Sequence, residues 1–196
     1  AAAALATLSS GPPLGPPPPV AWATKLGFRD WSELAVAKGV VISTNGTGKG
    51  GVFAVDSATG KLRWRAGDGN VSAAPPATDD AHAYFALGRP AALIAFRIED
   101  GKRVWSKPFA FVDDGQPVLV HDVVVVQGED GFLHAFDRAT GAERWKTQYA
   151  RTRNWCGAGR PAVADGEIYI SSGLQPPAQP KSDYFLHAID AKSGRE

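Results

Sequence analysis

A motif of fixed spacing occurs four times in this sequence of 196 residues. Each copy starts at an alanine and reaches a glycine six residues later, and the first three copies end at a tryptophan four residues beyond that glycine. The copies occupy residues 54–64, 95–105, 135–145 and 188–196, so their alanines are 41, 40 and 53 residues apart. A repeat of this length is one supersecondary unit, which buries its apolar face by stacking on its neighbours.

The residues of the motif predict a strand, a tight turn and a second strand. An alternating apolar run precedes each turn. In three copies an aspartate can accept bonds from backbone N–H groups at the start of the turn, and the glycine supplies a positive φ at its end. The tryptophan can pack between neighbouring units and give its N–H to a backbone carbonyl, and the small alanine leaves room for its ring. The structural motif comprises Trp22, Asp56, Gly60, Trp64, Gly101, Trp105, Asp137, Gly141, Trp145, Asp190 and Gly194.

The second copy departs from this pattern, because Arg97 replaces the aspartate and Asp100 replaces the threonine. It keeps Gly101, so we expect the turn to form there as well. Two β-branched runs flanking a hairpin signal lie upstream of each motif. These signals are Lys38-Gly39, Asp79-Asp80, His121-Asp122 and Asp165-Gly166. The sequence therefore predicts an all-β protein of four-stranded antiparallel blades, with four blades visible and almost no helix.

The strand with its Ala-x-Asp-x-x-Thr-Gly-x-x-x-Trp motif, spanning residues 20–196, resembles the repeat of pyrroloquinoline-quinone (PQQ) type β-propellers. That family includes quinoprotein alcohol dehydrogenases and the lipoprotein of the outer-membrane β-barrel assembly machinery. The resemblance implies a ring of seven or eight blades, of which this chain shows part. Many members bind no quinone, so the motif implies the fold and leaves the activity open.

Residues 1–19 are interpreted as a signal-peptide remnant or a proline-rich disordered linker, since residues 11–20 include six prolines. We expect a periplasmic or extracellular protein on this basis. No window is long and apolar enough for a transmembrane helix. The 21 basic and 20 acidic residues give no indication of binding to nucleic acid.

Residues 20–25 read as an orphan fourth strand that contains Trp22. Joining Gly194-Arg-Glu196 to Ala21-Trp22 restores the four-residue step from glycine to tryptophan. Three arrangements follow, namely a fragment of a larger ring whose last blade Trp22 closes, a closed four-bladed ring, or two chains paired into eight blades. We favour the fragment, because proteins normally cover an unpaired blade edge. Open blade edges would also favour self-association.

Loops between the second and third strands and between blades lie on one face of a propeller, and every long loop of this sequence falls there. We expect a ligand or partner to bind that face. The candidate binding residues are Arg151, Arg153, Asn154, Trp155 and Arg160. Guanidinium groups suit carboxylate or quinone oxygens, and an indole can stack on a planar ring. The alternative is a packing tryptophan among solvated arginines.

Two functions fit these observations. The first is a non-catalytic binding or scaffold propeller that takes a protein partner or a small ligand. The alternative is a fragment of a PQQ-dependent quinoprotein dehydrogenase, for which the resemblance implies PQQ, Ca²⁺ and a carboxylate base. Asp113, Asp114, Glu129 and Asp130 lie on the expected face, but turn solvation explains them equally well. The four histidines show no metal-binding spacing and Cys156 has no evident histidine partner, so we assign no catalytic residue and no metal site.

Overall fold

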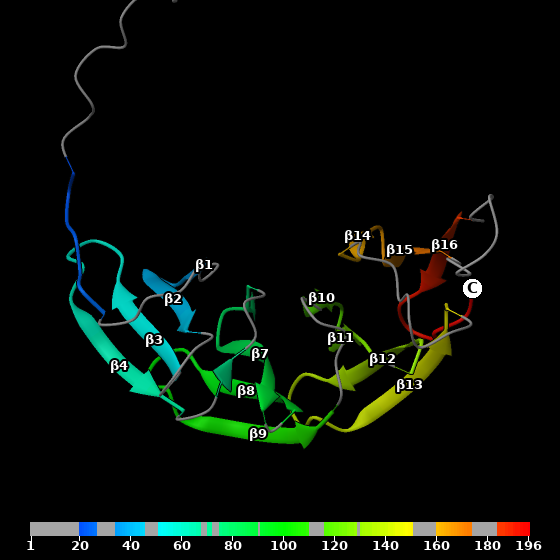
Figure 1. Cartoon of the computed structure of the whole chain (residues 1–196), viewed down its shortest axis with the longest axis horizontal. Coiled ribbons are helices and arrows are strands. Elements are labelled where there is room, and N and C mark those ends of the chain that lie inside the picture. The colour runs from blue at the N-terminus through cyan, green and yellow to red at the C-terminus, as the bar shows by residue number, and fades with distance from the viewer. Residues whose placement is uncertain are drawn as a thin grey trace, which may run out of the picture.

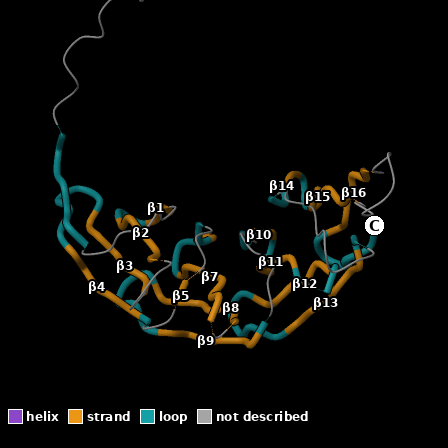
Figure 2. Tube along the Cα trace, in the orientation of Figure 1, coloured by secondary structure: helices purple, strands orange, loops and turns teal. Residues whose placement is uncertain are grey.

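The computed structural model describes residues 20–26, 34–45, 51–67, 70–71, 75–89, 91–109, 116–128, 130–150, 160–173 and 184–196. Over these residues the protein consists of strands, turns and loops (Figure 2). No helix among them is long and apolar enough to cross a membrane. The predicted all-β fold is confirmed.

The strands form four antiparallel sheets, which we number as blades 1 to 4 in chain order. Blade 1 contains β1 (Leu34–Ala37), β2 (Val40–Asn45), β3 (Gly51–Asp56) and β4 (Leu62–Ala66). Blade 2 contains β5 (Asn70–Val71), β6 (Ala77–Thr78), β7 (His82–Arg89), β8 (Ala91–Arg97) and β9 (Arg103–Pro108). Blade 3 contains β10 (Val118–Val120), β11 (Val123–Gln127), β12 (Phe132–Asp137) and β13 (Glu143–Gln148). Blade 4 contains β14 (Ala162–Ala164), β15 (Glu167–Gly173) and β16 (Tyr184–Asp190).

The blades follow one another along an open arc (Figure 1). The outer strands β4, β9 and β13 line its convex side, and β1, β10 and β14 face its hollow. Residues 20–26 lie beside blade 1 at one end, and β16 lies at the other end. The chain therefore does not close a four-bladed ring on itself in this structure.

The apolar core is divided among the three seams between blades. Val40, Ile42 and Ala54 of blade 1 pack with Ala83 and Phe85 of blade 2. Two further clusters fill the seams between blades 2 and 3 and between blades 3 and 4. Each blade thus buries apolar side chains against the next one, as the repeat predicts.

The hairpin turns between the first two strands of blades 1 and 4 have the backbone that their sequences indicate. Lys38 and Gly39 have φ values of 48° and 70°, and Asp165 and Gly166 have values of 52° and 84°. Positive φ at both central residues is the mark of a type I′ turn, whose twist matches that of the flanking strands. These turns leave one face of the arc with short connections.

Candidate functional site

A carboxylate holds together the turn that follows the third strand of a blade. In blade 1, Asp56 accepts hydrogen bonds from the backbone N–H and the hydroxyl of Thr59, both at 2.8 Å. Its other oxygen accepts one from Arg63 at 2.5 Å. Bonding to Arg63 and then to Thr59 holds the pKa of Asp56 well below its usual range. This carboxylate is charged at neutral pH, and its bonds shape the turn.

Blade 3 repeats this arrangement, and blade 2 inverts it. Asp137 bonds Thr140 and Arg144 in blade 3. In blade 2 the two charges change places, and Arg97 Nε donates to Asp100 Oδ1 at 2.8 Å. The turn still closes, because the N–H of Gly101 donates to the carbonyl oxygen of Arg97 at 2.9 Å. The second copy of the motif thus keeps an ion pair in its turn, with the arginine at the position where the other copies have the aspartate.

Each tryptophan of the motif lies against the turn of the following blade. Its Nε1 donates to a backbone carbonyl there, at 2.9 Å for Trp22 to Ser57, 2.7 Å for Trp64 to Ile98, 2.8 Å for Trp105 to Arg138 and 3.0 Å for Trp145 to Ala191. The ring faces the motif glycine of that same turn. A Cβ at Gly60, Gly101, Gly141 or Gly194 would lie 2.6 to 2.7 Å from the facing ring. Glycine is required for this approach as well as for φ values of 68° to 71°.

A polar cluster joins blades 2 and 3 beside this contact. The buried Tyr84 donates its hydroxyl to Asp79 Oδ2 at 2.9 Å, and Arg138 Nη1 lies 3.5 Å from the same oxygen. Burial opposes the charge of Asp79, but donors from Ala81, His82 and Tyr84 outweigh it and lower its pKa. Burial raises the pKa of Tyr84, as does its bond to Asp79. Hydrogen bonds thus cross this seam from one blade to the next.

The equivalent place between blades 1 and 2 is hollow. A cavity of about 360 Å³ opens there, on the face that carries the short turns. Its lining residues are Lys38, Val40, Arg63, Asp80, Ala81, Arg97, Ile98 and Glu99. The lining thus combines charges of both signs with three apolar side chains. Such a mixture can bind a ligand through ion pairs and apolar contacts.

A comparison of the repeats shows how this seam differs from the next one. The backbone carbonyl of Ile98 accepts a hydrogen bond from the indole N–H of Trp64. In the next seam the carbonyl of Arg138 accepts the same bond from Trp105. The strand partners place Ile42 in blade 1 where Tyr84 stands in blade 2, since each pairs with the motif alanine. The seam between blades 1 and 2 therefore has isoleucines where its neighbour has a tyrosine and an arginine. An aliphatic pair cannot form the polar cluster.

The cations of the cavity are held by carboxylates. Arg63 binds Asp56, Arg97 binds Asp100, and Lys38 Nζ lies 3.7 Å from Asp80 Oδ2. Loop length predicts a site on the other face, because the connections on this face are short. The repeat-to-repeat comparison at position 98, where the next blade has Arg138, is the signal that the sequence carries.

The candidate residues Arg151, Arg153, Asn154 and Trp155 lie outside the described residues, as do Asp113, Asp114, Glu129 and Cys156. Arg160 is exposed just before β14. The structure therefore leaves the predicted binding loop as a hypothesis.

Asp130 and two of the histidines take part in contacts within blades. His134 Nε2 lies 3.0 Å from Asp130 Oδ2, and its Nδ1 lies 2.7 Å from Glu143 Oε1. His187 occupies the same repeat position and pairs through Nδ1 with Glu196 at 2.7 Å. Both histidines therefore tie the third strand of their blade to the residues after its turn.

PQQ and Ca²⁺ are the groups that a quinoprotein would need. Within the described ranges, no three His, Cys, Asp or Glu side chains come together in a way that could hold a metal ion. Three turn carboxylates that could supply oxygen ligands are bound to arginines of their own turns, namely Asp56, Asp100 and Asp137. The donor set described here does not fit a Ca²⁺ site.

Comparison with known proteins decides the family. Residues 19–196 match the family described as outer membrane protein assembly factor BamB. The chain belongs to this family. BamB from Moraxella catarrhalis superposes with a TM-score of 0.69 at 21 % identity, over 89 % of this chain and 51 % of that one. The BamB family assignment confirms the PQQ-like resemblance and the propeller fold.

Two enzymes are similar to this BamB family member, one in structure and one in sequence. Quinohemoprotein alcohol dehydrogenase ADHIIG from Pseudomonas putida HK5 superposes with a TM-score of 0.62 at 19 % identity, over 88 % of this chain and 34 % of that one. Tetrathionate hydrolase from Acidithiobacillus ferrooxidans is 27 % identical over 165 residues, which are 82 % of this chain and 32 % of the relative. The chain spans about half the length of the BamB structure and about a third of this hydrolase.

Proposed function

We propose that this chain is a non-catalytic binding propeller that holds a protein partner. The observation that carries the proposal is that charged side chains of the repeat turns are paired with one another. In the turns of blades 1 to 3 an arginine and a carboxylate are bound to each other, as Asp56 and Arg63 show with an oxygen–nitrogen distance of 2.5 Å. Groups bound in this way support a rigid scaffold. Membership of a family described as an assembly factor supports the same function.

The cavity between blades 1 and 2 offers a place for a partner's side chain. Lys38 and Asp80 at its rim are solvent-exposed, with side-chain exposures of 57 % and 94 %. Their 3.7 Å contact is a surface ion pair, which costs little free energy to open. An arriving peptide with one acidic and one basic residue can therefore replace it. The loop bearing Arg151, Arg153, Asn154, Trp155 and Arg160 remains a second proposed contact on the opposite face.

The cavity is tested with tetrapeptides that carry one Glu and one Arg. Chemical-shift perturbation in the ¹⁵N-labelled chain is expected at Ala81 and Glu99. Ala81→Phe, which adds a ring to the exposed rim, should abolish these shifts, whereas Ala139→Phe in an exposed turn of blade 3 should not. Shifts spread evenly over the surface, or unchanged in Ala81→Phe, would show that the cavity is not the binding place.

The tetrathionate hydrolase relative favours a second candidate, an enzyme of the same fold. The discriminating measurement is the melting temperature and absorbance of the pure protein with PQQ and Ca²⁺, and separately with tetrathionate. The scaffold proposal predicts that the melting temperature and the quinone absorbance stay unchanged and that tetrathionate is not consumed. A shifted quinone absorbance with a raised melting temperature, or consumption of tetrathionate, would overturn it. We also propose a periplasmic or extracellular location, which the family's description as an outer membrane assembly factor supports.

A further inference from the structure

The charged side chains that line the cavity between blades 1 and 2 differ in how far they are already paired. Arg63 donates to Asp56, and Arg97 donates to Asp100. Glu99 forms no hydrogen bond or ion pair within the part of the chain that the structure describes. The charge of Glu99 raises the pKa of Arg97, but it only adds to the larger effect of the bond to Asp100. The carboxylate of Glu99 is therefore open to a cation from another molecule.

A second carboxylate of the lining is held weakly. The Asp80 side chain is 94 % exposed, and its oxygen lies 3.7 Å from Lys38 Nζ. Two exposed charges at this separation gain little free energy from pairing. Asp80 and Glu99 belong to two short connections of blade 2, residues 79–81 before β7 and residues 98–102 after β8. A cation that enters the cavity thus finds a carboxylate on each of two connections.

The next seam shows which cation fits such a space. Between blades 2 and 3 the chain places its own Arg138 there, with Nη1 3.5 Å from Asp79 Oδ2. Ile98 stands at the corresponding position of the cavity, since the backbone carbonyls of both residues accept the same indole bond. Isoleucine carries no charge, so the cavity lacks the guanidinium group that the next seam contains. An arginine of another chain can supply that group.

The apolar part of the lining suits the rest of an arginine side chain. Val40 and Ile98 are buried residues of the lining, and Ala81 is exposed at the rim. The methylene groups of arginine pack on apolar surface while its planar head bonds to carboxylates. The cavity of about 360 Å³ has the size of a small-ligand pocket, so it takes a side chain and not a whole strand or helix.

We propose that the cavity binds an arginine side chain of the protein partner, with the guanidinium group bonded to Asp80 and Glu99. The inference rests on the proposed binding function and names the residue that the partner inserts. The arginine replaces Lys38 at Asp80, and its methylene groups contact Val40 and Ile98. Bidentate bonding to a carboxylate favours arginine over lysine, because only the guanidinium group is planar and forked.

Three N-acetylated and C-amidated tripeptides test the ligand, namely Gly-Arg-Gly and its relatives with citrulline or glutamate in the middle. Citrulline keeps the shape of arginine and lacks its charge. Titrations followed by the amide shifts of Ala81 and Glu99 give the affinities. We expect the arginine peptide to bind about tenfold more tightly than the citrulline peptide, the effect of losing one charge-assisted hydrogen bond. The glutamate peptide should bind more weakly still.

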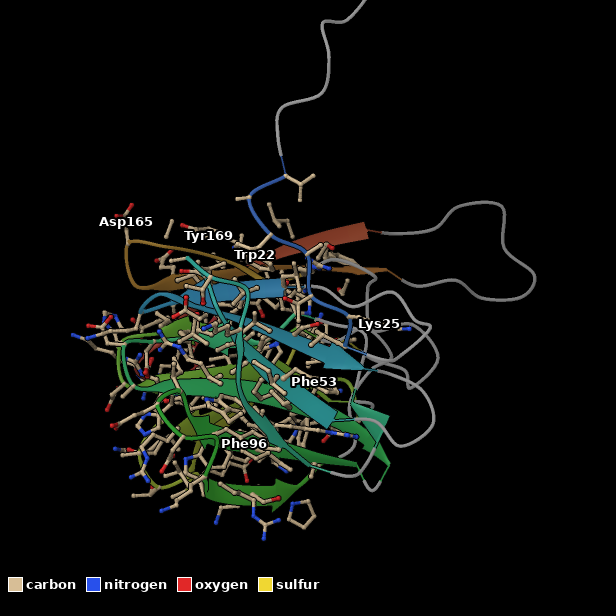
Figure 3. All side chains as sticks on the ribbon, turned by 90° about the vertical axis from the view of Figure 1, so that its left-hand side faces the viewer. Trp22, Lys25, Phe53, Phe96, Asp165 and Tyr169 are labelled. Carbon is tan, nitrogen blue, oxygen red and sulfur yellow. The ribbon has the colours of Figure 1, made fainter. Side chains whose placement is uncertain are left out.

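Substitutions in the chain test the two carboxylates. Glu99→Gln and Asp80→Asn should each weaken binding of the arginine peptide about five- to tenfold. Asp165→Asn is the matched control and should leave the affinity unchanged, because the exposed Asp165 lies in the corresponding hairpin of blade 4. Figure 3 shows this hairpin at one side of the arc, with Lys25 toward the opposite side.

A fourth substitution places the guanidinium group in the chain itself. Ile98→Arg gives this seam the residue that Arg138 is in the next one, and it should abolish binding of the arginine peptide. Ile98 is buried, so the melting temperature reports whether this variant folds. If it does not fold, the affinity of Glu99→Gln remains the deciding measurement.

Equal affinity for the arginine and citrulline peptides, tighter binding of the glutamate peptide, or an unchanged affinity in Glu99→Gln would overturn the arginine assignment. If the glutamate peptide binds and its shifts disappear in Ala81→Phe, the cavity is a binding place and only the preference for arginine is wrong. If no peptide shifts the amides of Ala81 and Glu99, the cavity itself is not the binding place.

Discussion

The indole of Trp64 lies on Gly101 of the following blade and donates from Nε1 to the carbonyl oxygen of Ile98 at 2.7 Å. A Cβ at Gly101 would come within 2.6 Å of the ring. One residue pair thus joins two consecutive repeats by apolar contact next to a hydrogen bond. The same relationship recurs at every seam and connects the motif to the arc.

Gly101→Ala should destabilise the protein by about 2–4 kcal/mol, because it adds a left-handed backbone penalty to overpacking against the ring. Gly67→Ala is the matched control. Gly67 has a similar φ of 75°, but a Cβ there would meet no atom of the described residues closer than 3.9 Å. In the control the free energy of unfolding should fall only by the cost of the left-handed backbone, about 1–2 kcal/mol. Urea unfolding measures both, and equal losses would mean that the ring contact adds nothing.

Tyr84→Phe should cost about 1–2 kcal/mol, because it removes a buried hydroxyl that serves Asp79. Tyr169→Phe is the control. Its hydroxyl bonds Glu167 at 2.8 Å at a partly exposed position, so its loss should cost less than about 0.5 kcal/mol. Thermal unfolding compares the two variants. A loss in Tyr169→Phe as large as in Tyr84→Phe would contradict the role of the polar cluster.

Acid should weaken the turn of blade 3. Bonding to Arg144, and then to Thr140, lowers the pKa of Asp137 from 3.8 to about 2. A carboxyl with a lowered folded pKa contributes stability above its unfolded pKa, and this stability is lost as pH falls from about 4 to about 2. The melting temperature of wild type should therefore fall more steeply over this range than that of Asp137→Asn. Asp80→Asn, at a side chain 94 % exposed, should behave like wild type.

The inverted turn of blade 2 predicts a compensating pair of substitutions. Arg97→Asp alone places two carboxylates together and should lower stability. Adding Asp100→Thr restores the pattern of Asp56 and Thr59 and should recover about 0.5–1 kcal/mol of that loss. A double-mutant cycle by urea unfolding gives the coupling. If the two changes simply add, Arg97 and Asp100 do not act as a pair.

Much of the fold could be predicted from the sequence because each strand and turn is encoded locally. Asp56 and Gly60 mark their turn within five residues, and Lys38-Gly39 marks a hairpin by itself. The structure adds the contacts between side chains of neighbouring repeats. The second requirement on Gly101, to leave space for Trp64, depends on residues from two blades.

The candidate site could be predicted less well for the same reason. The cluster of Tyr84, Asp79 and Arg138 and the cavity near Ile98 depend on side chains from neighbouring blades. A column-by-column comparison of the repeats would have shown the change from isoleucine to tyrosine. It would not have shown that Lys38 and Asp80 meet at 3.7 Å, since that contact needs the seam geometry.

The coupling between Trp64 and Gly101 tests most directly the claim that the repeats are held together by ring against glycine. The measurement is the free energy of unfolding in urea for wild type, Gly101→Ala, Trp64→Leu and the double variant. With the ring removed, Gly101→Ala should cost no more than Gly67→Ala does in wild type, about 1–2 kcal/mol. A cost for Gly101→Ala that is the same with tryptophan or leucine at position 64 would contradict the claim.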